Sequence, residues 1–356
     1  MHKDDQMTPN QRLAAFSEGR EIDRIPMLPF LATIGVKVAG MTLRDMRANA
    51  ANEAKVQIDC YKRLGNDGLT VDYGLHGIGI ALGSKVNDPE YGVPVIQEFA
   101  LSDLKNLDQL DFSKTERGND PELQQRYQAA ELMLEAVGDE CGVDVTISGP
   151  FTAAASIYPT GQLLRGLVKD PENIHKLLGI CADTIINICK DLHSLGLSFT
   201  LCDPIASGTV LKKQNYQDFV FPYTQRIVNE LHQAGASVGY HICGNTTSIV
   251  EPMVDTGVDL LSLDNLVDME TAKQKVGGRI CLVGNVDPMG VMTEGSPEDV
   301  DLAVKECFRK AFDSPCGFIL ATGCDIPYDG SLENLDQFMA SGRKYGKWPL
   351  DGSRYL

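Results

Sequence analysis

Short apolar runs rich in Val, Ile and Leu recur along the chain about every 40 residues, and a stretch with helical periodicity follows each of them. The runs predict eight buried strands, at residues 25–32, 68–72, 143–148, 198–202, 237–241, 258–263, 279–284 and 317–321. Apolar residues at helical spacing predict helices between them, for example at residues 171–195, 215–234, 246–256 and 297–313.

This alternation of strands and helices predicts a parallel α/β fold, and eight repeats of the unit favour closure into a (β/α)8 TIM barrel. The structural alternative is an open, doubly wound sheet. Such a sheet usually has a glycine-rich phosphate loop after its first strand, and Leu28-Pro29-Phe30-Leu31-Ala32 contains no glycine. We therefore expect one barrel domain over residues 1–356.

Two elaborations of this barrel are predicted. Thr8-Pro9 resembles an N-cap followed by proline at the first helical position, which predicts a leading helix over residues 9–17. The connection between the second and third predicted strands is long, at about 70 residues. It contains Tyr91-Gly92-Val93-Pro94-Val95-Ile96, which predicts a hairpin, and the polar run 113–120, so we expect an insertion around residues 85–125.

Composition narrows the class of protein. Hydrophobic residues make up 43% of the 356 residues and charged residues 23%, which is ordinary for a soluble globular enzyme. The net charge of -17 argues against a nucleic-acid partner and against an anionic membrane surface. No apolar run is long enough for a membrane span, and the polar N-terminus contains no secretory signal. The ten cysteines include no C-x-x-C pair and are widely spread, so we expect reduced thiols in a cytoplasmic protein.

In a barrel of this kind, catalytic groups follow the C-terminal ends of the strands. Six of the predicted strand ends are polar: Gly149-Pro150, Asp203-Pro204, His241-Ile242-Cys243-Gly244, Asp264-Asn265, Asn285-Val286-Asp287-Pro288 and Thr322-Gly323-Cys324-Asp325. Thiols occur at two of these ends, so a site that uses thiol chemistry is expected there.

His241 and Cys243 are two residues apart, so their side chains share one face of an extended strand end. Cys324 follows the last predicted strand, and the end of that strand lies at the same mouth of the barrel. One imidazole and two thiolates match the ligand preference of Zn2+, and three protein ligands leave a fourth position for substrate. The alternative is that His241 is a hydrogen-bonded core histidine and that both cysteines are small apolar core residues.

Several segments carry a family resemblance that spans nearly the whole chain. They are Leu261-Ser262-Leu263-Asp264-Asn265, the element Gly284-Asn285-Val286-Asp287-Pro288, the helix with Phe219, Pro222 and Tyr223, and the opening Asn10-Gln11-Arg12-Leu13 with Asp23-Arg24-Ile25-Pro26. Together they resemble the uroporphyrinogen decarboxylase superfamily, and specifically its branch of methylcobamide:coenzyme M methyltransferases. The resemblance implies the TIM barrel already expected from periodicity.

The two branches of that superfamily differ at the site. The decarboxylases carry R-Q-A-G-R after the first strand, where this chain has Leu31-Ala32-Thr33-Ile34-Gly35, without the arginines that would hold a tetrapyrrole. They also read G-H-G after the eighth strand, where this chain has Gly323-Cys324-Asp325. The methyltransferase branch uses an H-x-C pair and a later cysteine as zinc ligands, which implies His241, Cys243 and Cys324 here.

The resemblance implies a zinc-dependent methyltransferase that moves a methyl group between a corrinoid on a partner protein and a small thiol such as coenzyme M, in either direction. Asp203 is the candidate fourth metal ligand, with capping of the helix that follows it as the alternative. Asp72, Asp264 and Asn285 are candidate substrate-binding residues, although Asp72 could be a helix cap and Asn285 could shape its turn. Asp264 could also orient His241 or complete the resting zinc shell.

Two other functions remain open at this point. The first is a decarboxylase of the uroporphyrinogen type, which shares the fold and needs no cofactor. The second is a non-catalytic scaffold on which a corrinoid protein docks. Metal-dependent turnover distinguishes the methyltransferase from both.

Overall fold

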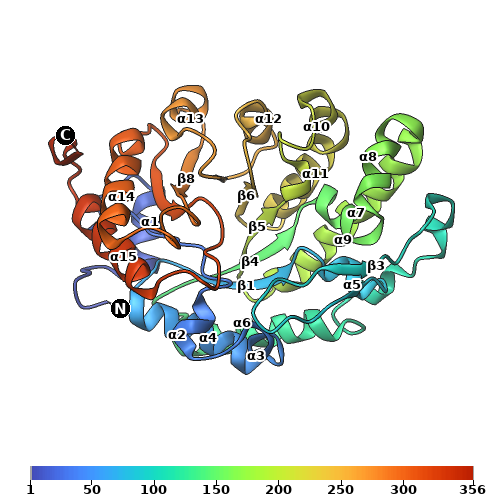
Figure 1. Ribbon diagram of the computed structural model, residues 1–356, viewed down its shortest axis with the longest axis horizontal. Coiled ribbons are helices and arrows are strands. Elements are labelled where there is room, and N and C mark those ends of the chain that lie inside the picture. Colours follow the sequence, from blue (N-terminus) through green and yellow to red (C-terminus); the bar gives the residue numbers. More distant parts are fainter. Residues whose placement is uncertain (1, 356) are drawn as a thin grey trace.

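The structure is a computed structural model and describes residues 2–355. Seven parallel strands form one sheet in the order β1-β4-β5-β6-β7-β8-β9, and helices surround its outer face (Figure 1). The strands are β1 Leu69–Gly74, β4 Val143–Ser148, β5 Ser198–Cys202, β6 Val238–Ile242, β7 Leu260–Leu263, β8 Cys281–Val286 and β9 Phe318–Thr322. These seven strands confirm the predicted ones: β4 and β5 match the predicted bounds, and the ends of the other five differ by at most two residues.

The prediction of a regular first strand at residues 25–32 is wrong. This segment makes only a bridge between Met27 and Leu320 of β9, with the Leu28 N–H donating to the Leu320 carbonyl at 2.9 Å. Pro26 and Pro29 have no N–H to donate, so a ladder cannot continue on either side. On the other flank, the Asp67 N–H donates to the Met27 carbonyl at 2.9 Å, just before β1. The segment therefore occupies the eighth position, between β9 and β1.

The leading helix is confirmed as α1 Pro9–Ser17, with Thr8 and Gln11 forming a capping box. The predicted helix at 215–234 is two helices, α10 Lys213–Phe219 and α11 Phe221–Gln233, because Pro222 cannot continue the hydrogen-bond pattern of α10. The remaining helices are α2 Gly35–Ala39, α3 Leu43–Arg47, α4 Ala50–Leu64, α5 Gly77–Ala81, α6 Pro121–Val137, α7 Pro150–Ile157, α8 Thr160–Lys169, α9 Pro171–His193, α12 Val250–Asp255, α13 Met269–Val276, α14 Pro297–Ala311 and α15 Leu332–Gly346. None of the helices within residues 2–355 combines the length and apolarity that crossing a membrane requires.

The long connection after β1 contains the expected hairpin. Strands β2 Lys85–Val86 and β3 Ile96–Glu98 pair antiparallel, and residues 91–95 lie between them. Short 3-10 helices follow at Leu104–Gln109 and Phe112–Thr115. The Tyr91 ring lies 4.7 Å from that of Tyr328, centroid to centroid, which places the hairpin beside the loop that follows β9.

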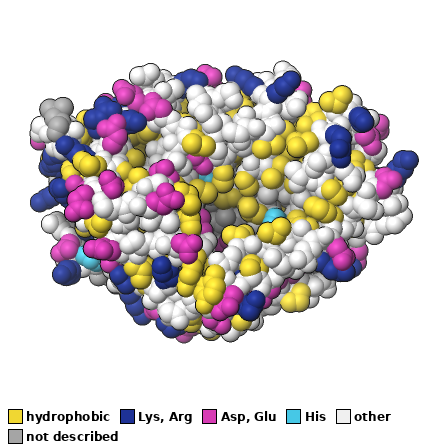
Figure 2. All heavy atoms as spheres, viewed as in Figure 1, with side chains coloured by type: hydrophobic (Ala, Val, Ile, Leu, Met, Phe, Trp, Pro, Cys, Tyr) yellow, Lys and Arg dark blue, Asp and Glu magenta, His cyan; other side chains and the backbone are white. Residues whose placement is uncertain are grey.

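The inner wall of the barrel is polar on one side and apolar on the other. Along β1, β4 and β5, fully buried apolar residues alternate with partly exposed polar ones, namely Thr70, Asp72, Asp144, Thr146, Ser198 and Thr200. Because helices cover the outer face, the polar set faces inward. On β8 and β9 the corresponding residues are Cys281, Val283, Ile319 and Ala321, which form a small apolar cluster. Figure 2 shows a hollow near the middle of the molecule, bordered largely by hydrophobic and uncharged side chains.

Candidate metal centre

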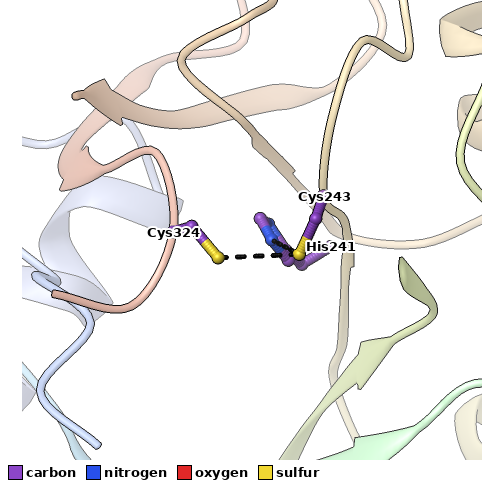
Figure 3. Close-up of side chains that lie close together, drawn as sticks. All are labelled: His241, Cys243 and Cys324. Carbon is purple, nitrogen blue, oxygen red and sulfur yellow. Dashed lines mark hydrogen bonds between the residues drawn. The ribbon is translucent and has the colours of Figure 1, made fainter. Parts of the chain in front are cut away.

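Three side chains from two strand ends converge in the barrel mouth (Figure 3). His241 lies near the end of β6, Cys243 follows β6 directly, and Cys324 comes two residues after β9. Their ligand atoms all lie within 4.8 Å of one another. The His241 Nε2 to Cys243 Sγ distance is 3.3 Å, and the two sulfur atoms are 3.5 Å apart. No other group of three potential His, Cys, Asp or Glu ligands within residues 2–355 comes as close.

Neighbouring elements fix the orientation of His241. The residue is only 2% exposed, and its Nδ1 lies 3.0 Å from the Ser262 hydroxyl of β7, its partner in the strand register. The ring of Phe30 packs against the imidazole, with centroids 5.3 Å apart. These contacts occupy one ring nitrogen and leave Nε2 facing the sulfur atoms, as a metal ligand requires.

The contact between the two thiols shifts their pKa values in opposite directions. The hydrogen bond from Cys243, aided by nearby His241, lowers the pKa of the Cys324 thiol to about 4 against the effect of burial. The same hydrogen bond, together with burial, raises the pKa of the Cys243 thiol. A separation of 3.5 Å is well beyond the roughly 2.05 Å of a disulfide, so both cysteines are reduced. An imidazole nitrogen and two sulfur atoms form a donor set that suits Zn2+.

Asp203 is not among the three converging residues, and its role as a fourth metal ligand stays a prediction. Its carboxylate accepts hydrogen bonds from the Phe151 N–H at 3.2 Å, the Thr152 N–H at 2.7 Å and the Thr152 hydroxyl at 2.6 Å. These bonds cap the N-terminus of α7, which precedes Asp203 in the chain. The sequence alternative was a cap of the helix that follows Asp203, and the short helix Pro204–Ala206 has no capping hydrogen bond with this side chain. Burial raises the pKa of Asp203 to about 6, although the bonds from Thr152 oppose the shift. A side chain at Gly149 would clash with Asp203, because a Cβ there would lie 2.6 Å from the carboxylate.

Asp264 and Asn285 hold loops of the barrel mouth in place. The Asp264 carboxylate accepts from the Gly244 N–H at 2.8 Å and from the Leu266 N–H at 2.9 Å. The Asn285 amide donates to the carbonyls of Asp264 at 3.0 Å and Val267 at 2.7 Å. These bonds position the loop that carries Cys243, and the expected role of both residues in substrate binding stays a prediction.

Asp72 faces the interior of the barrel. It lies within β1, whereas the predicted strand ended at this residue. One of its oxygens accepts from the Gly74 N–H at 2.8 Å, and burial raises its pKa.

The structure adds a second carboxylate that the sequence did not single out, that of Asp325, next to Cys324. Asp325 accepts from the Thr33 N–H at 3.2 Å and from the Thr33 hydroxyl, and burial raises its pKa to about 7. The sequence signal that could have identified Asp325 is its position in the polar segment that follows the last predicted strand.

Ser262 was also missed by sequence reasoning. It lies inside β7, two residues before the polar strand end, and its contact with His241 follows only from the register of β6 and β7. A pairing of this kind can be predicted only once the strand order and the register are known.

A D-x-H-x-x-G pattern, which is typical of corrinoid-binding modules, occurs at Asp191-Leu192-His193-Ser194-Leu195-Gly196. It lies at the end of α9, before β5, and therefore at the opposite end of the barrel from the His/Cys cluster. Asp191 pairs with Arg117, and His193 Nδ1 lies 2.8 Å from the Leu197 carbonyl. Both side chains therefore interact with residues at that end of the barrel, and they take no part in the His/Cys cluster at the mouth.

Comparison with known proteins gives matches over most of the chain. The model of the family described as uroporphyrinogen decarboxylase (URO-D) matches residues 8–345. Methylcobamide:CoM methyltransferase MtbA of Methanosarcina mazei is 30% identical over 349 residues, which cover 95% of this chain and 98% of that protein. Uroporphyrinogen decarboxylase of Trichodesmium erythraeum is 31% identical over 222 residues, which cover 60% of this chain and 61% of that protein.

Among solved structures, a methyltransferase from Methanosarcina mazei superposes with a TM-score of 0.82. The match covers 96% of this chain and 99% of that one, at 22% sequence identity. This likeness confirms the TIM-barrel fold class expected from the sequence.

Proposed function

Because this chain belongs to the uroporphyrinogen decarboxylase family, we propose that it is a zinc-dependent methyltransferase that moves a methyl group between a corrinoid and a small thiol. The observation that carries the proposal is the convergence of His241, Cys243 and Cys324 within 4.8 Å in the barrel mouth. The relative named as a methylcobamide:CoM methyltransferase matches 95% of the chain, whereas the decarboxylase relative matches 60%. Both facts favour the methyltransferase branch.

The donor set fits the metal. Nε2 of His241 and the sulfur atoms of Cys243 and Cys324 would hold Zn2+, and a fourth position is left for the substrate. When bound, Zn2+ lowers the pKa of a substrate thiol, so that its sulfur is a nucleophile at neutral pH. Two cysteine ligands donate charge toward the metal, which favours alkylation of sulfur over hydrolysis.

The chain's own residues orient and enclose this chemistry. Ser262 holds the His241 ring, and Asp264 holds the backbone next to Cys243. The tilted ring of Phe30 packs against the imidazole, with centroids 5.3 Å apart, and adds an apolar contact beside the metal-binding atoms. We propose that the methyl-corrinoid is presented by a partner protein that docks over the mouth, where the cluster is reached from outside.

A decarboxylase is the competing function. The chain lacks arginine in Leu31-Ala32-Thr33-Ile34-Gly35, where the decarboxylases would bind the carboxylates of a tetrapyrrole.

The test is to incubate the zinc-loaded protein with methylcobalamin and a thiol, and to follow the loss of the methyl-cobalt absorbance with and without a chelator. Demethylation that the chelator abolishes, that the Cys243→Ala variant lacks and that the exposed Cys316→Ala control retains would support the proposal. Metal-independent turnover of uroporphyrinogen would replace it with the decarboxylase. Tight binding of a corrinoid protein with no turnover would replace it with the docking scaffold.

A further inference from the structure

Three exposed apolar side chains lie on loops of the barrel mouth. Val210, Leu266 and Met289 follow β5, β7 and β8, and they are 45%, 59% and 50% exposed. A single exposed apolar residue is ordinary on a protein surface. These three, called the apolar rim below, border one opening, and Figure 2 shows hydrophobic side chains around that hollow. Apolar groups gathered at an opening mark a surface that binds another molecule.

The strand order places the apolar rim among the metal-binding residues. Along the sheet, β6 lies between β5 and β7, and β9 lies next to β8. The loop with Val210 therefore comes before the loop with Cys243. The loops with Leu266 and Met289 come next, and the loop with Cys324 follows them. The three apolar side chains and the two thiols thus belong to five consecutive loops.

Close packing holds the turn with Val210 against the loop of Cys243. Gly244 follows Cys243 directly, and a Cβ there would lie 2.7 Å from the Ser207 hydroxyl and 3.3 Å from the Thr209 hydroxyl. Val210 is the next residue, and its N–H donates to the Ser207 carbonyl at 2.8 Å. The exposed Val210 side chain is therefore carried by a turn that packs against the neighbour of one metal-binding thiol.

The loop with Leu266 contacts both of the loops that supply a thiol. One carboxylate oxygen of Asp264 accepts from the Leu266 N–H at 2.9 Å, and the other accepts from the Gly244 N–H at 2.8 Å. On its other side, Asn265 packs against Gly323 of the β9 loop, because a Cβ at Gly323 would lie 3.1 Å from the Asn265 Cα. Leu266 is therefore held between the loops that carry the two thiols.

Met289 is presented by the same kind of turn as Leu266. The Asp287 carboxylate accepts from the Met289 N–H at 2.9 Å. The end of β8 that precedes this turn is joined to the β9 loop, since the Gly323 N–H donates to the Val286 carbonyl at 2.7 Å. In both turns the carboxylate accepts from backbone N–H groups of the mouth loops, and the side chain that reaches solvent is apolar.

Displacement at carbon is in line, so the bond to the methyl group must point at the substrate sulfur. The corrin ring that carries the methyl group would therefore lie across the mouth, and it is much wider than the group it delivers. Resting on the proposed methyltransferase function, we infer that Val210, Leu266 and Met289 form the contact surface for this ring. The ligand class is the uncharged macrocycle of a corrinoid, which these side chains bind by removing hydrophobic area from water.

The test uses the zinc-loaded protein and methylcobalamin. Equilibrium dialysis, read by the absorbance of the corrinoid, measures the Kd without any need for turnover. Leu266→Ser and Met289→Ser should each raise this Kd about fivefold, and Val210→Ser about threefold, because each removes hydrophobic area from the contact. Leu302→Ser is the matched control and should leave the Kd unchanged, because Leu302 is 63% exposed but lies on α14, outside the barrel.

A second readout separates contact with the ring from support of the loops. In the demethylation assay with 2-mercaptoethanol, Leu266→Ser and Met289→Ser should raise the KM for methylcobalamin as they raise its Kd. They should leave kcat and the zinc content unchanged, because neither residue supplies a metal ligand. Leu266→Met keeps the hydrophobic area and should bind methylcobalamin as the wild type does.

Kd values of the rim variants that match the Leu302→Ser control would overturn the contact surface. So would a rise in Kd that occurs only where zinc is also lost, because the shape of the loops would then be responsible. The two proposals fail separately. If no variant and not even the wild type demethylates methylcobalamin, the proposed function fails, while the Kd series still decides what the apolar rim binds. If demethylation proceeds with one Kd in all variants, the function stands and the contact surface is wrong.

Discussion

The Asp264 carboxylate accepts a hydrogen bond from the Gly244 N–H at 2.8 Å, and so ties the end of β7 to the residue directly after Cys243. Gly244 has a φ of +83°, a conformation that side chains rarely adopt, and a Cβ there would lie 2.7 Å from the Ser207 hydroxyl. The turn after Cys243 is therefore defined by a carboxylate on one side and by close packing on the other. The position of one thiol thus depends on the Asp264 carboxylate.

We predict that Asp264→Ala weakens zinc affinity by about ten- to a hundredfold, because the loop carrying Cys243 loses its anchor. Competition with a chromophoric chelator measures the Kd. The matched control is Asp287→Ala, since Asp287 caps the loop after β8 through the N–H groups of Met289 and Gly290 but lies beside no cluster residue. Equal affinity in the Asp264 variant and the wild type would show that the loop holds its shape without this bond.

We predict about one zinc per chain in the purified protein, and loss of most of it in Cys324→Ala. Metal analysis gives the content, and circular dichroism should show an unchanged fold, because the cluster lies in the mouth and not in the apolar core. Cys316→Ala, which removes an exposed thiol outside the cluster, should keep full occupancy. Full zinc content in the Cys324 variant would remove that residue from the ligand set.

We predict that Asp203→Asn flattens the dependence of stability on pH. The pKa of Asp203 is raised from 3.8 to about 6 in the folded protein, so the folded state binds more protons than the unfolded state between these values. Its contribution to the free energy of unfolding is therefore greatest below pH 3.8 and falls as pH rises through 6, by on the order of 2–3 kcal/mol. Urea unfolding at pH 4, 5, 6 and 7 measures the difference between variant and wild type. A constant difference across that range would contradict the prediction.

We predict that Arg24→Ala lowers the free energy of unfolding by about 3–5 kcal/mol. Arg24 is 3% exposed and pairs with Asp67 at 2.6 Å and Asp5 at 2.8 Å, so its removal leaves two buried carboxylates short of a partner. Arg44→Ala is the control, because its pair with Asp88 is exposed and should contribute less than about 1 kcal/mol. Chemical denaturation measures both. Similar losses in the two variants would show that burial does not decide the contribution of these pairs.

The sequence predicted the parts of the fold that depend on local pattern. Seven strands were found because both faces of a parallel sheet's strands are buried, which gives continuous apolar runs. The segment at 25–32 has the same apolar character, but Pro26 and Pro29 prevent a ladder, and the prediction gave apolarity more weight than the missing N–H groups. The break between α10 and α11 at Pro222 was missed for the same reason.

The site was predictable to the extent that it follows from strand ends. His241, Cys243 and Cys324 converge because the carboxyl ends of parallel strands meet at one mouth. Sequence position places Asp203 and Asp264 at that mouth too, but it does not reveal which N–H groups donate hydrogen bonds to their carboxylate oxygens. Those bonds depend on how α7 and the β6 loop approach, which is a matter of tertiary packing.

The segment between β9 and β1 lacks a continuous ladder, and it is also the segment that supplies Phe30 to His241 and Thr33 to Asp325. Beyond the bridge it is fastened by individual contacts, such as the Phe30 N–H to the Thr322 hydroxyl at 3.1 Å. The strands β6 and β9, which lead to the three metal-binding side chains, are instead joined through β7 and β8 by continuous ladders. The wall that holds the metal-binding side chains in register is therefore connected along its length by backbone hydrogen bonds, whereas the segment that shields His241 depends on isolated ones.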